Sequence, residues 1–210
     1  MDINAIRSGT IRNLAGADLE DADLSSCDLS GVTFSGAQLT GANLSKSTLS
    51  RAKLDGATLL GAILTGADLR ASFWGANLMQ ADLTGSDLRG ANLRGANLMG
   101  TTLTGASLAG AFLNGANLMG VNLQGVDLRG SDLRGVNLNG ANLKGAVLSR
   151  ADLQGAMLND ANLEEADLSE ANLAGASLSG ANLLCADVSG THTEGVNLAG
   201  ACLIGTQLAA

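Results

Sequence analysis

Proline and tyrosine are both absent from this sequence, and aromatic residues make up only 2% of its 210 residues. Ordinary proteins carry proline at about 5% of positions. Because proline lacks a backbone N–H, its absence predicts that nearly every N–H is needed in a hydrogen-bonded ladder. The composition therefore indicates strands almost throughout, unlike an ordinary globular domain.

Other absences narrow the function. No apolar run approaches the ~18 residues that a membrane helix needs, so no membrane span is expected. The opening segment MDINAIRSGT lacks the basic start and apolar core of a secretory signal, which predicts a cytoplasmic protein. The net charge is −8 and no basic stripe is present, which argues against direct nucleic-acid binding. Cys27, Cys185 and Cys202 match no disulfide or metal spacing, so reduced thiols are expected.

The sequence is built on a five-residue repeat. From Leu14 to Leu69 a large apolar residue, here called the centre, returns every five positions for 12 units. The step to Phe73 is four residues, a one-residue deletion at 70/71. The period of five then holds for 28 units to Leu208, with Val188 and Thr193 as the only weak centres. A small residue, mostly Ala, lies two positions before the centre, and Asn or Asp usually lies between them. Gly lies two positions after the centre in most units.

This order of residues predicts a short side followed by a corner. Side chains alternate along a strand, so the small residue and the centre point inward together while the residue between them faces solvent. Gly after each side suits a turn that needs a positive φ. Recurrent exceptions show how many sides make one coil, because Met79, Met99 and Met119 are spaced by twenty residues, or four units.

The units GADLE, GANLS, GANLR and GANLM resemble the pentapeptide repeat family, whose pattern is A(D/N)LXX. The resemblance covers residues 12–210. It implies an all-β fold, a right-handed quadrilateral parallel β-helix or solenoid, with four pentapeptides per coil and about ten coils.

The two ends of the chain differ in sequence. Residues 1–11 lie outside the repeat, and Asp2 as an N-cap, Ile3 and Ile6 on one face and Gly9 as a stop predict a short helical cap over the first coil. The last coil has no visible equivalent. An uncovered ladder edge invites pairing, so an end-to-end homodimer through the C-terminal coil is expected.

The resemblance leaves two functions open. Members include quinolone-resistance and topoisomerase-inhibiting proteins whose acidic rods imitate DNA, and many bacterial proteins of unknown role. One hypothesis is a non-enzymatic scaffold that mediates protein–protein interaction. The other is a DNA mimic that binds a type II topoisomerase, DNA gyrase or topoisomerase IV, and protects it from quinolones or toxins. That branch usually has Phe-rich centres, whereas the centres here are mostly Leu.

A DNA mimic would use unpaired carboxylates, which gather in two clusters: Asp18, Glu20, Asp21, Asp23 and Asp28, then Asp160, Glu164, Glu165, Asp167 and Glu170. Alternation and corners splay these groups over different sides, so convergent metal ligation is not expected. On another side, Asp precedes the centre and Arg follows it, at Asp68/Arg70, Asp87/Arg89 and Asp127/Arg129. Pairing within these sets would neutralise that side.

A scaffold would use two outward-facing sets. The first is an apolar column of Leu60, Met79, Met99 and Met119, with Met157 further along the same side. Contiguous exposed apolar surface often marks an interface, and Met suits adaptable ones. The second comprises Trp74, Arg94 and Arg134 in one outer column, with Phe112 beside it. Trp, Phe and Arg are typical interface anchors, although stacking of Arg94 on Trp74 would equally suit a local cation–π contact.

Catalytic chemistry is not indicated. His192 is the only His, and it occupies an outward Asn/Asp position in an irregular unit, GTHTEG. The Gly residues recur as corners instead of forming one phosphate-binding loop before a helix. We therefore expect no enzyme activity, no cofactor and no metal, and a partner that is another protein.

Overall fold

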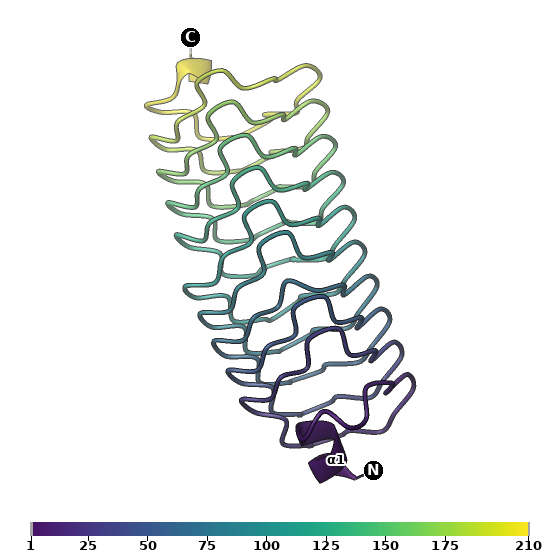
Figure 1. The fold of residues 1–210 in the computed structure, drawn as a ribbon. Helices are drawn as coiled ribbons and strands as arrows, with labels where there is room; N and C mark the ends of the chain where they lie inside the picture. Colours follow the sequence, from purple (N-terminus) through teal and green to yellow (C-terminus); the bar gives the residue numbers. More distant parts are fainter. Residues whose placement is uncertain (1, 210) are drawn as a thin grey trace.

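The computed structural model describes residues 2–209 as a rod of stacked coils, with the N-terminus at one end and the C-terminus at the other (Figure 1). Two helices are present in the described residues, α1 (Ile3–Arg7) and the 3₁₀ helix η1 (Gln207–Ala209). Neither is long and apolar enough to cross a membrane. All remaining structure consists of sides and corners.

Each side is held by a single parallel bridge residue, and bridged residues lie twenty positions apart, as in Asn13 with Thr33 and Asp18 with Gln38. The expectation of strands almost throughout is wrong in this respect: no strand longer than one bridge occurs in residues 2–209. The reason is that a corner interrupts the chain in every unit of five residues. Bridges recur every five residues along the chain, so each coil has four sides.

We name the sides by their columns of bridged residues. The Trp side contains Ser72, Asn92, Phe112 and Asp132; the Met side contains Asn77, Asn97, Asn117 and Asn137; the Asn side contains Asp82, Thr102, Asn122 and Asn142; and the Arg side contains Asp68, Asp87, Ser107 and Asp127.

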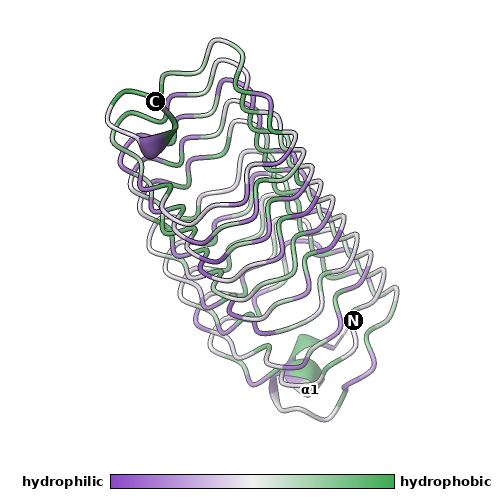
Figure 2. Ribbon diagram, turned by 90° about the horizontal axis from the view of Figure 1, so that it is seen from above, coloured by the Kyte–Doolittle hydropathy of each residue, from purple (hydrophilic) through white to green (hydrophobic). Residues whose placement is uncertain are grey.

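The core runs the length of the rod and is made by the centres and the small residues. Leu39, Leu88 and Phe73 have no exposed surface, and most of the inward Ala residues are equally buried. Hydropathy alternates along each coil because inward apolar residues alternate with outward polar ones (Figure 2). Burial of a Leu side chain contributes roughly 2 kcal/mol, so stability accumulates with each stacked coil.

Corner residues two positions after the centre adopt a positive φ. Gly takes this conformation without strain, but several corners place a charged residue there, such as Arg51 (φ 60°) and Arg150 (φ 59°). A side chain in the left-handed region costs about 1 kcal/mol. These corners therefore carry charge at the expense of local stability.

Helix α1 covers the first coil. The Asp2 carboxylate accepts a hydrogen bond from the Ala5 N–H at 3.2 Å, as an N-cap does. Ile6 is only 1% exposed, and Arg7 donates to the Asp23 carbonyl at 2.9 Å. The helix thus supplies apolar contact and hydrogen bonds to the end of the core.

The four-residue step after Leu69 tightens one corner. Elsewhere the N–H of the small residue bonds to the centre carbonyl three positions earlier, as Ala67 does to Leu64 at 3.1 Å. Here the Ala71 N–H bonds to the Leu69 carbonyl, two positions earlier, at 2.7 Å. Bridges across the step join residues nineteen apart, such as Lys53 and Ser72, and the sides continue in alignment.

The unit centred on Leu208 does not form a side. The sequence assigns it to the repeat, but residues 207–209 form η1, and the last bridge joins Asn182 to Cys202. Leu198, Leu203 and Leu208 remain partly exposed because no further coil packs on them in the described residues.

The coils are more widely spaced along the Asn side and at the corner leading to the Arg side, which we call the seam: residues 100–106 against 119–127, where the parallel bridge between Thr102 and Asn122 nevertheless remains. Ladder bonds that occur at equivalent positions along the rod fall outside hydrogen-bonding geometry here; the affected N–H groups are those of Gly100, Leu103, Gly105, Asn122 and Asp127. The wider spacing is visible at the left edge about halfway along the rod (Figure 1). The Met-side and Trp-side bonds of the same two coils are intact, for example Leu98 to Asn117 at 2.8 Å and Leu113 to Asp132 at 2.7 Å.

Candidate functional site

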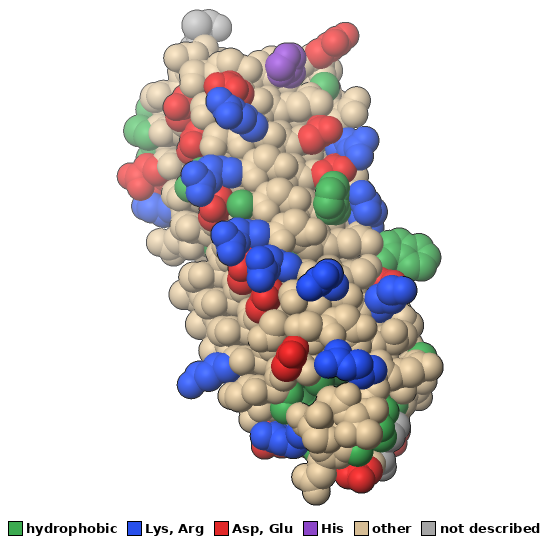
Figure 3. All heavy atoms as spheres, in the orientation of Figure 1, with side chains coloured by type: hydrophobic (Ala, Val, Ile, Leu, Met, Phe, Trp, Pro, Cys, Tyr) green, Lys and Arg blue, Asp and Glu red, His purple; other side chains and the backbone are tan. Residues whose placement is uncertain are grey.

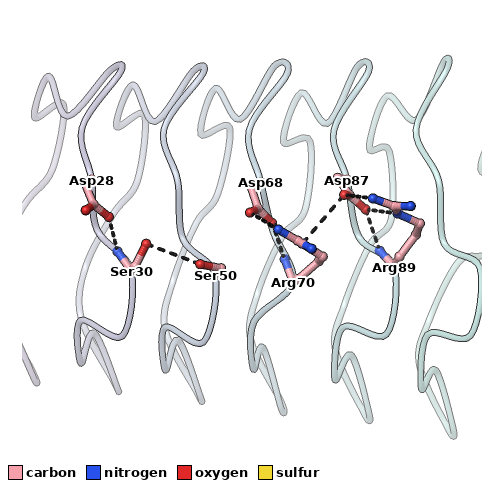
Figure 4. A network of polar contacts seen from close by, with 7 residues as sticks. All are labelled: Asp28, Ser30, Ser50, Asp68, Arg70, Asp87 and Arg89. Atoms are coloured by element: carbon pink, nitrogen blue, oxygen red, sulfur yellow. Dashed lines mark hydrogen bonds and ion pairs between the residues drawn. The ribbon is translucent and has the colours of Figure 1, made fainter.

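The Arg side is neutralised by its own ion pairs. Arg70 Nη2 lies 2.6 Å from Asp68 Oδ2, and Arg89 pairs with Asp87 at the same distance. Arg70 Nε also reaches Asp87 in the next coil at 3.7 Å, and Figure 4 shows these pairs in one column. The hydrogen bond from Arg70 holds the pKa of Asp68 below its usual value. These carboxylates are not free to imitate phosphates.

The second acidic cluster is also partly paired. Glu164 lies 2.8 Å from Lys144, and Glu170 lies 2.9 Å from Arg150, each across one coil. In the first cluster, Asp23 pairs with Arg7 at 3.5 Å. The other members of both clusters are spread over sides and corners, and no group of three potential metal ligands occurs within residues 2–209.

The Met column is less exposed than the sequence suggests. Met119 and Met157 are 44% and 40% exposed, but Leu60, Met79 and Met99 are half-buried. The column therefore presents less apolar surface to solvent than a row of fully exposed side chains would. The two exposed Met residues remain candidates for contact.

The Trp side holds the most exposed aromatic residues. Trp74 is 62% exposed and Phe112 is 39% exposed. The Arg94 guanidinium carbon lies 4.5 Å from the centroid of the Phe112 ring, so the cation–π contact forms with Phe112 and not with Trp74. Arg134 is held by Asp132 at 2.6 Å and reaches Asp152 at 3.6 Å. Within residues 2–209, Trp74 therefore has no stacked cation, and Arg134 serves mainly as a local ion-pair partner.

A shallow groove of about 420 Å³ lies at the corner between the Arg and Trp sides, where the four-residue step occurs. Its lining comes from four consecutive coils: Arg51, Ala52, Lys53, Arg70, Ala71, Ser72, Gly90, Asn92, Arg94 and Phe112. The five-residue pattern does not by itself predict this groove. The signals were the basic stretch at 46–53 and the four-residue step, which lie one coil apart.

Three cations of the groove are unpaired. None of the ion pairs found in residues 2–209 includes Arg51, Lys53 or Arg94. The nearby Asp55 carboxylate accepts hydrogen bonds from the Ser72 hydroxyl and, at 3.1 Å, from the Trp74 N–H. The face drawn in Figure 3 carries Lys and Arg side chains gathered near its middle, between Asp and Glu side chains.

A second hollow, of about 480 Å³, does not resemble a catalytic site. It is lined by charges of both signs, including Arg150, Glu170 and Glu194, together with His192. Within the described part of the chain, no hydrogen bond joins the His192 side chain to a Ser, Cys or carboxylate. No nucleophile and base are therefore brought together there.

Comparison with known proteins identifies the repeat. The family model described as pentapeptide repeats matches eight copies, over residues 13–45, 34–70, 70–100, 96–135, 130–164 and 158–192. No curated protein matches the sequence.

The chain is similar to solved structures of other proteins. HetL from the cyanobacterium Nostoc sp. strain PCC 7120, involved in heterocyst differentiation regulation, is 32% identical over 98% of this chain and 94% of its own, with a TM-score of 0.57. Rfr23 from the cyanobacterium Cyanothece 51142 is 30% identical over 60% of this chain and 87% of its own, with a TM-score of 0.38. QnrB1, a plasmid-mediated fluoroquinolone resistance protein, is 22% identical over 89% of this chain and 86% of its own, with a TM-score of 0.40.

Proposed function

Because the chain belongs to the pentapeptide repeat family and shares its right-handed quadrilateral β-helix, we propose that it is a non-enzymatic scaffold that binds a protein partner through its Trp side. The observation that carries this proposal is the exposure of Trp74 and Phe112 two coils apart on the same side, with Arg94 of the coil between them packed on the Phe112 ring. Exposed aromatic residues beside Arg are the residue types that dominate protein interfaces.

Rigidity supports this role. Both aromatic residues belong to coils that are joined to their neighbours by bridges. Phe112 is bridged to Asn92 and to Asp132, and Trp74 lies two residues after the bridged residue Ser72. Because the backbone at these residues is already fixed by bridges to the adjacent coils, less conformational entropy is lost when a partner binds. The Trp side can therefore act as a preformed surface.

Partner capture tests the proposal. The protein and its Trp74→Ala and Phe112→Ala variants are immobilised and exposed to cell lysate, with Ile63→Ala as the matched control because Ile63 is an exposed apolar residue on the Asn side. We expect one captured protein to be lost with either aromatic substitution and kept by the control. Capture that survives both aromatic substitutions would refute the proposed surface.

The alternative is a DNA mimic that binds DNA gyrase or topoisomerase IV. The neutralised Arg side disfavours it, because Asp68, Asp87 and Asp127 each have an Arg partner within 2.8 Å. A gyrase supercoiling assay with micromolar protein distinguishes the two. Inhibition or quinolone protection that is lost when the acidic clusters are changed to amides would favour the alternative.

A further inference from the structure

The groove between the Arg and Trp sides is a consequence of the missing corner residue. In the coils on either side, this corner position is occupied by Arg51 and by Gly90. The intervening coil has no residue there, and the Ala71 N–H closes the turn onto the Leu69 carbonyl. The indentation is therefore built into the backbone and does not depend on side-chain rotamers.

The rim of this indentation is positive although the protein as a whole is negative. Arg51 and Lys53 are exposed and Arg94 is half-buried, and each lines the groove without an ion-pair partner. Arg70 also lines it, but its charge is offset by Asp68 and Asp87. Three unpaired cations converging on one concave surface attract an anionic group.

Arg51 occupies its corner position in a backbone conformation that is unfavourable for a residue with a side chain. Its φ of 60° lies in the left-handed region, where Gly is normally found at these corners. Nine other non-Gly residues of the described chain adopt the same conformation, so backbone strain alone does not distinguish this corner. The groove supplies an independent reason for an Arg at this corner.

We propose that this groove binds a short acidic segment of a protein partner, with its carboxylates held by Arg51, Lys53 and Arg94. The proposal rests on the scaffold function and specifies the chemistry of the partner. The Phe112 ring, which packs on Arg94, forms an apolar wall against which the aliphatic part of such a segment packs. Trp74 follows Ser72, a groove residue, so an occupied groove lies beside the proposed aromatic surface.

The dimensions of the positive surface favour a short peptide over a nucleic acid. Double-stranded DNA carries one negative charge per ~1.7 Å of its axis. A duplex laid across the groove would bring phosphates against Asp68 and Asp87 on one side and Asp132 and Asp152 on the other. A peptide of a few residues ends before it reaches these carboxylates.

Titration with a defined probe tests the proposal. Synthetic hexaglutamate is added to the full chain at low salt, and the fluorescence of Trp74, the only Trp, is recorded together with calorimetry. We expect saturable binding that weakens as salt is raised, and no binding of hexalysine. Failure of hexaglutamate to bind at millimolar concentration would overturn the proposal.

Two variants separate the groove from overall charge. Arg51→Gln combined with Lys53→Gln should weaken hexaglutamate binding about tenfold, as expected for the loss of two exposed charge pairs. Lys46→Gln combined with Arg129→Gln removes the same charge outside the groove and should change affinity less than about twofold. Equal weakening by both double variants would show non-specific attraction and contradict the proposal.

A third variant tests the backbone. Insertion of Gly between Arg70 and Ala71 restores the five-residue unit while keeping every cation, and we expect an unchanged fold with at least about tenfold weaker peptide binding. Full binding by a folded insertion variant would show that the indentation is not required. A 12-base-pair duplex that binds more tightly than hexaglutamate and is sensitive to Arg51 and Lys53 would reassign the groove to nucleic acid.

The outcome is distinguishable from that of the scaffold proposal. If partner capture depends on Trp74 but hexaglutamate does not bind, the scaffold function stands and the acidic segment is rejected. If hexaglutamate binds in the groove but no partner depends on Trp74 or Phe112, the anion groove stands and the aromatic surface is rejected.

Discussion

Two stretches of the Asn side differ although both follow the same repeat. Between residues 122 and 182 the coils are joined by an amide ladder, in which the side chain of Asn142 donates to Asn122 at 3.0 Å and that of Asn182 donates to Asn162 at 3.2 Å. At the seam, one coil earlier, Thr102 stands in place of Asn and backbone bonds are lost. The quality of coil stacking therefore depends on which residues meet twenty positions apart.

The inward residues change at the same place. In the regular stretch the small positions are Ala141, Ala161 and Ala181, whereas at the seam Thr101 stacks directly beneath Val121. Both are β-branched and both are buried, so each adds atoms where Ala leaves room. Extra methyl groups in a close-packed core force backbone shifts. We attribute the seam to this stacked pair, without an amide ladder outside to hold the coils together.

The largest expected effect is a difference between the two stretches in the free energy of unfolding that is lost when a buried Leu is replaced by Ala. Leu143→Ala in the regular stretch should cost about 4 kcal/mol, and Leu103→Ala at the seam about 2 kcal/mol, although both side chains are fully buried. The cost is smaller where the surrounding coils can collapse into the space. Urea denaturation of the two variants measures the difference; a Leu103 cost equal to or above that of Leu143 would contradict it.

Amide hydrogen exchange measures the difference in backbone protection between the seam and the regular stretch. The Leu103 and Gly105 amides should exchange at least about tenfold faster than those of Leu143 and Gly145, because only the latter donate to ladder carbonyls. Val121→Ala should slow exchange at Leu103 and Gly105 by closing the seam. The matched control is Val136→Ala, where the ladder is already intact; it should not slow exchange. Unchanged exchange in Val121→Ala would show that the stacked pair does not cause the separation.

A smaller effect on stability is expected from substituting the outward-facing residue of the seam. Thr102→Asn extends the amide ladder by one coil below Asn122 and should stabilise the protein by about 1 kcal/mol, the net value of one hydrogen bond. Thr102→Val has no side-chain amide to donate to the ladder and should not stabilise the protein. Thermal denaturation of both variants checks this; equal shifts in Tm would remove the ladder from the explanation.

The smallest expected effect on stability comes from an ion pair on the Trp side, where the backbone bonds between the two coils of the seam are intact. The Arg134 hydrogen bond lowers the pKa of Asp132 from 3.8 to about 2. Because the folded-state pKa is depressed, the stabilisation is present above about pH 4 and is lost as pH falls toward 2. We expect at most about 1 kcal/mol, since Arg134 is half-exposed. Asp132→Asn should flatten the acid limb of the stability profile, and an unchanged limb would exclude a role for this pair.

Much of the fold could be predicted from the sequence because one rule repeats. The alternation around each centre places Phe73 inward and Trp74 outward, as the structure has them. The coil of four sides follows from recurrent exceptions such as Met79 and Met99. What the pattern could not specify was the length of each side, since a bridge of one residue and a short strand have the same periodicity.

The candidate site was less predictable because it depends on contacts between coils. The position of Arg94 is evident from the repeat, but its choice of Phe112 over Trp74 depends on side-chain conformation. Arg51 and Lys53 were visible as part of a basic stretch. That they border a hollow follows from the way in which the Leu69–Ala71 turn closes, which periodicity alone does not describe.

The four-residue step also bears on how such a protein changes over generations. A unit that is one residue short at a corner leaves every later side in its original column, as the bridge from Lys53 to Ser72 shows. Loss or gain of one whole unit of five would instead rotate all later sides by a quarter turn and exchange the surfaces they present. A one-residue deletion at a corner can thus create a local groove. Only insertions or deletions of multiples of twenty residues can lengthen or shorten the rod and keep each surface in register.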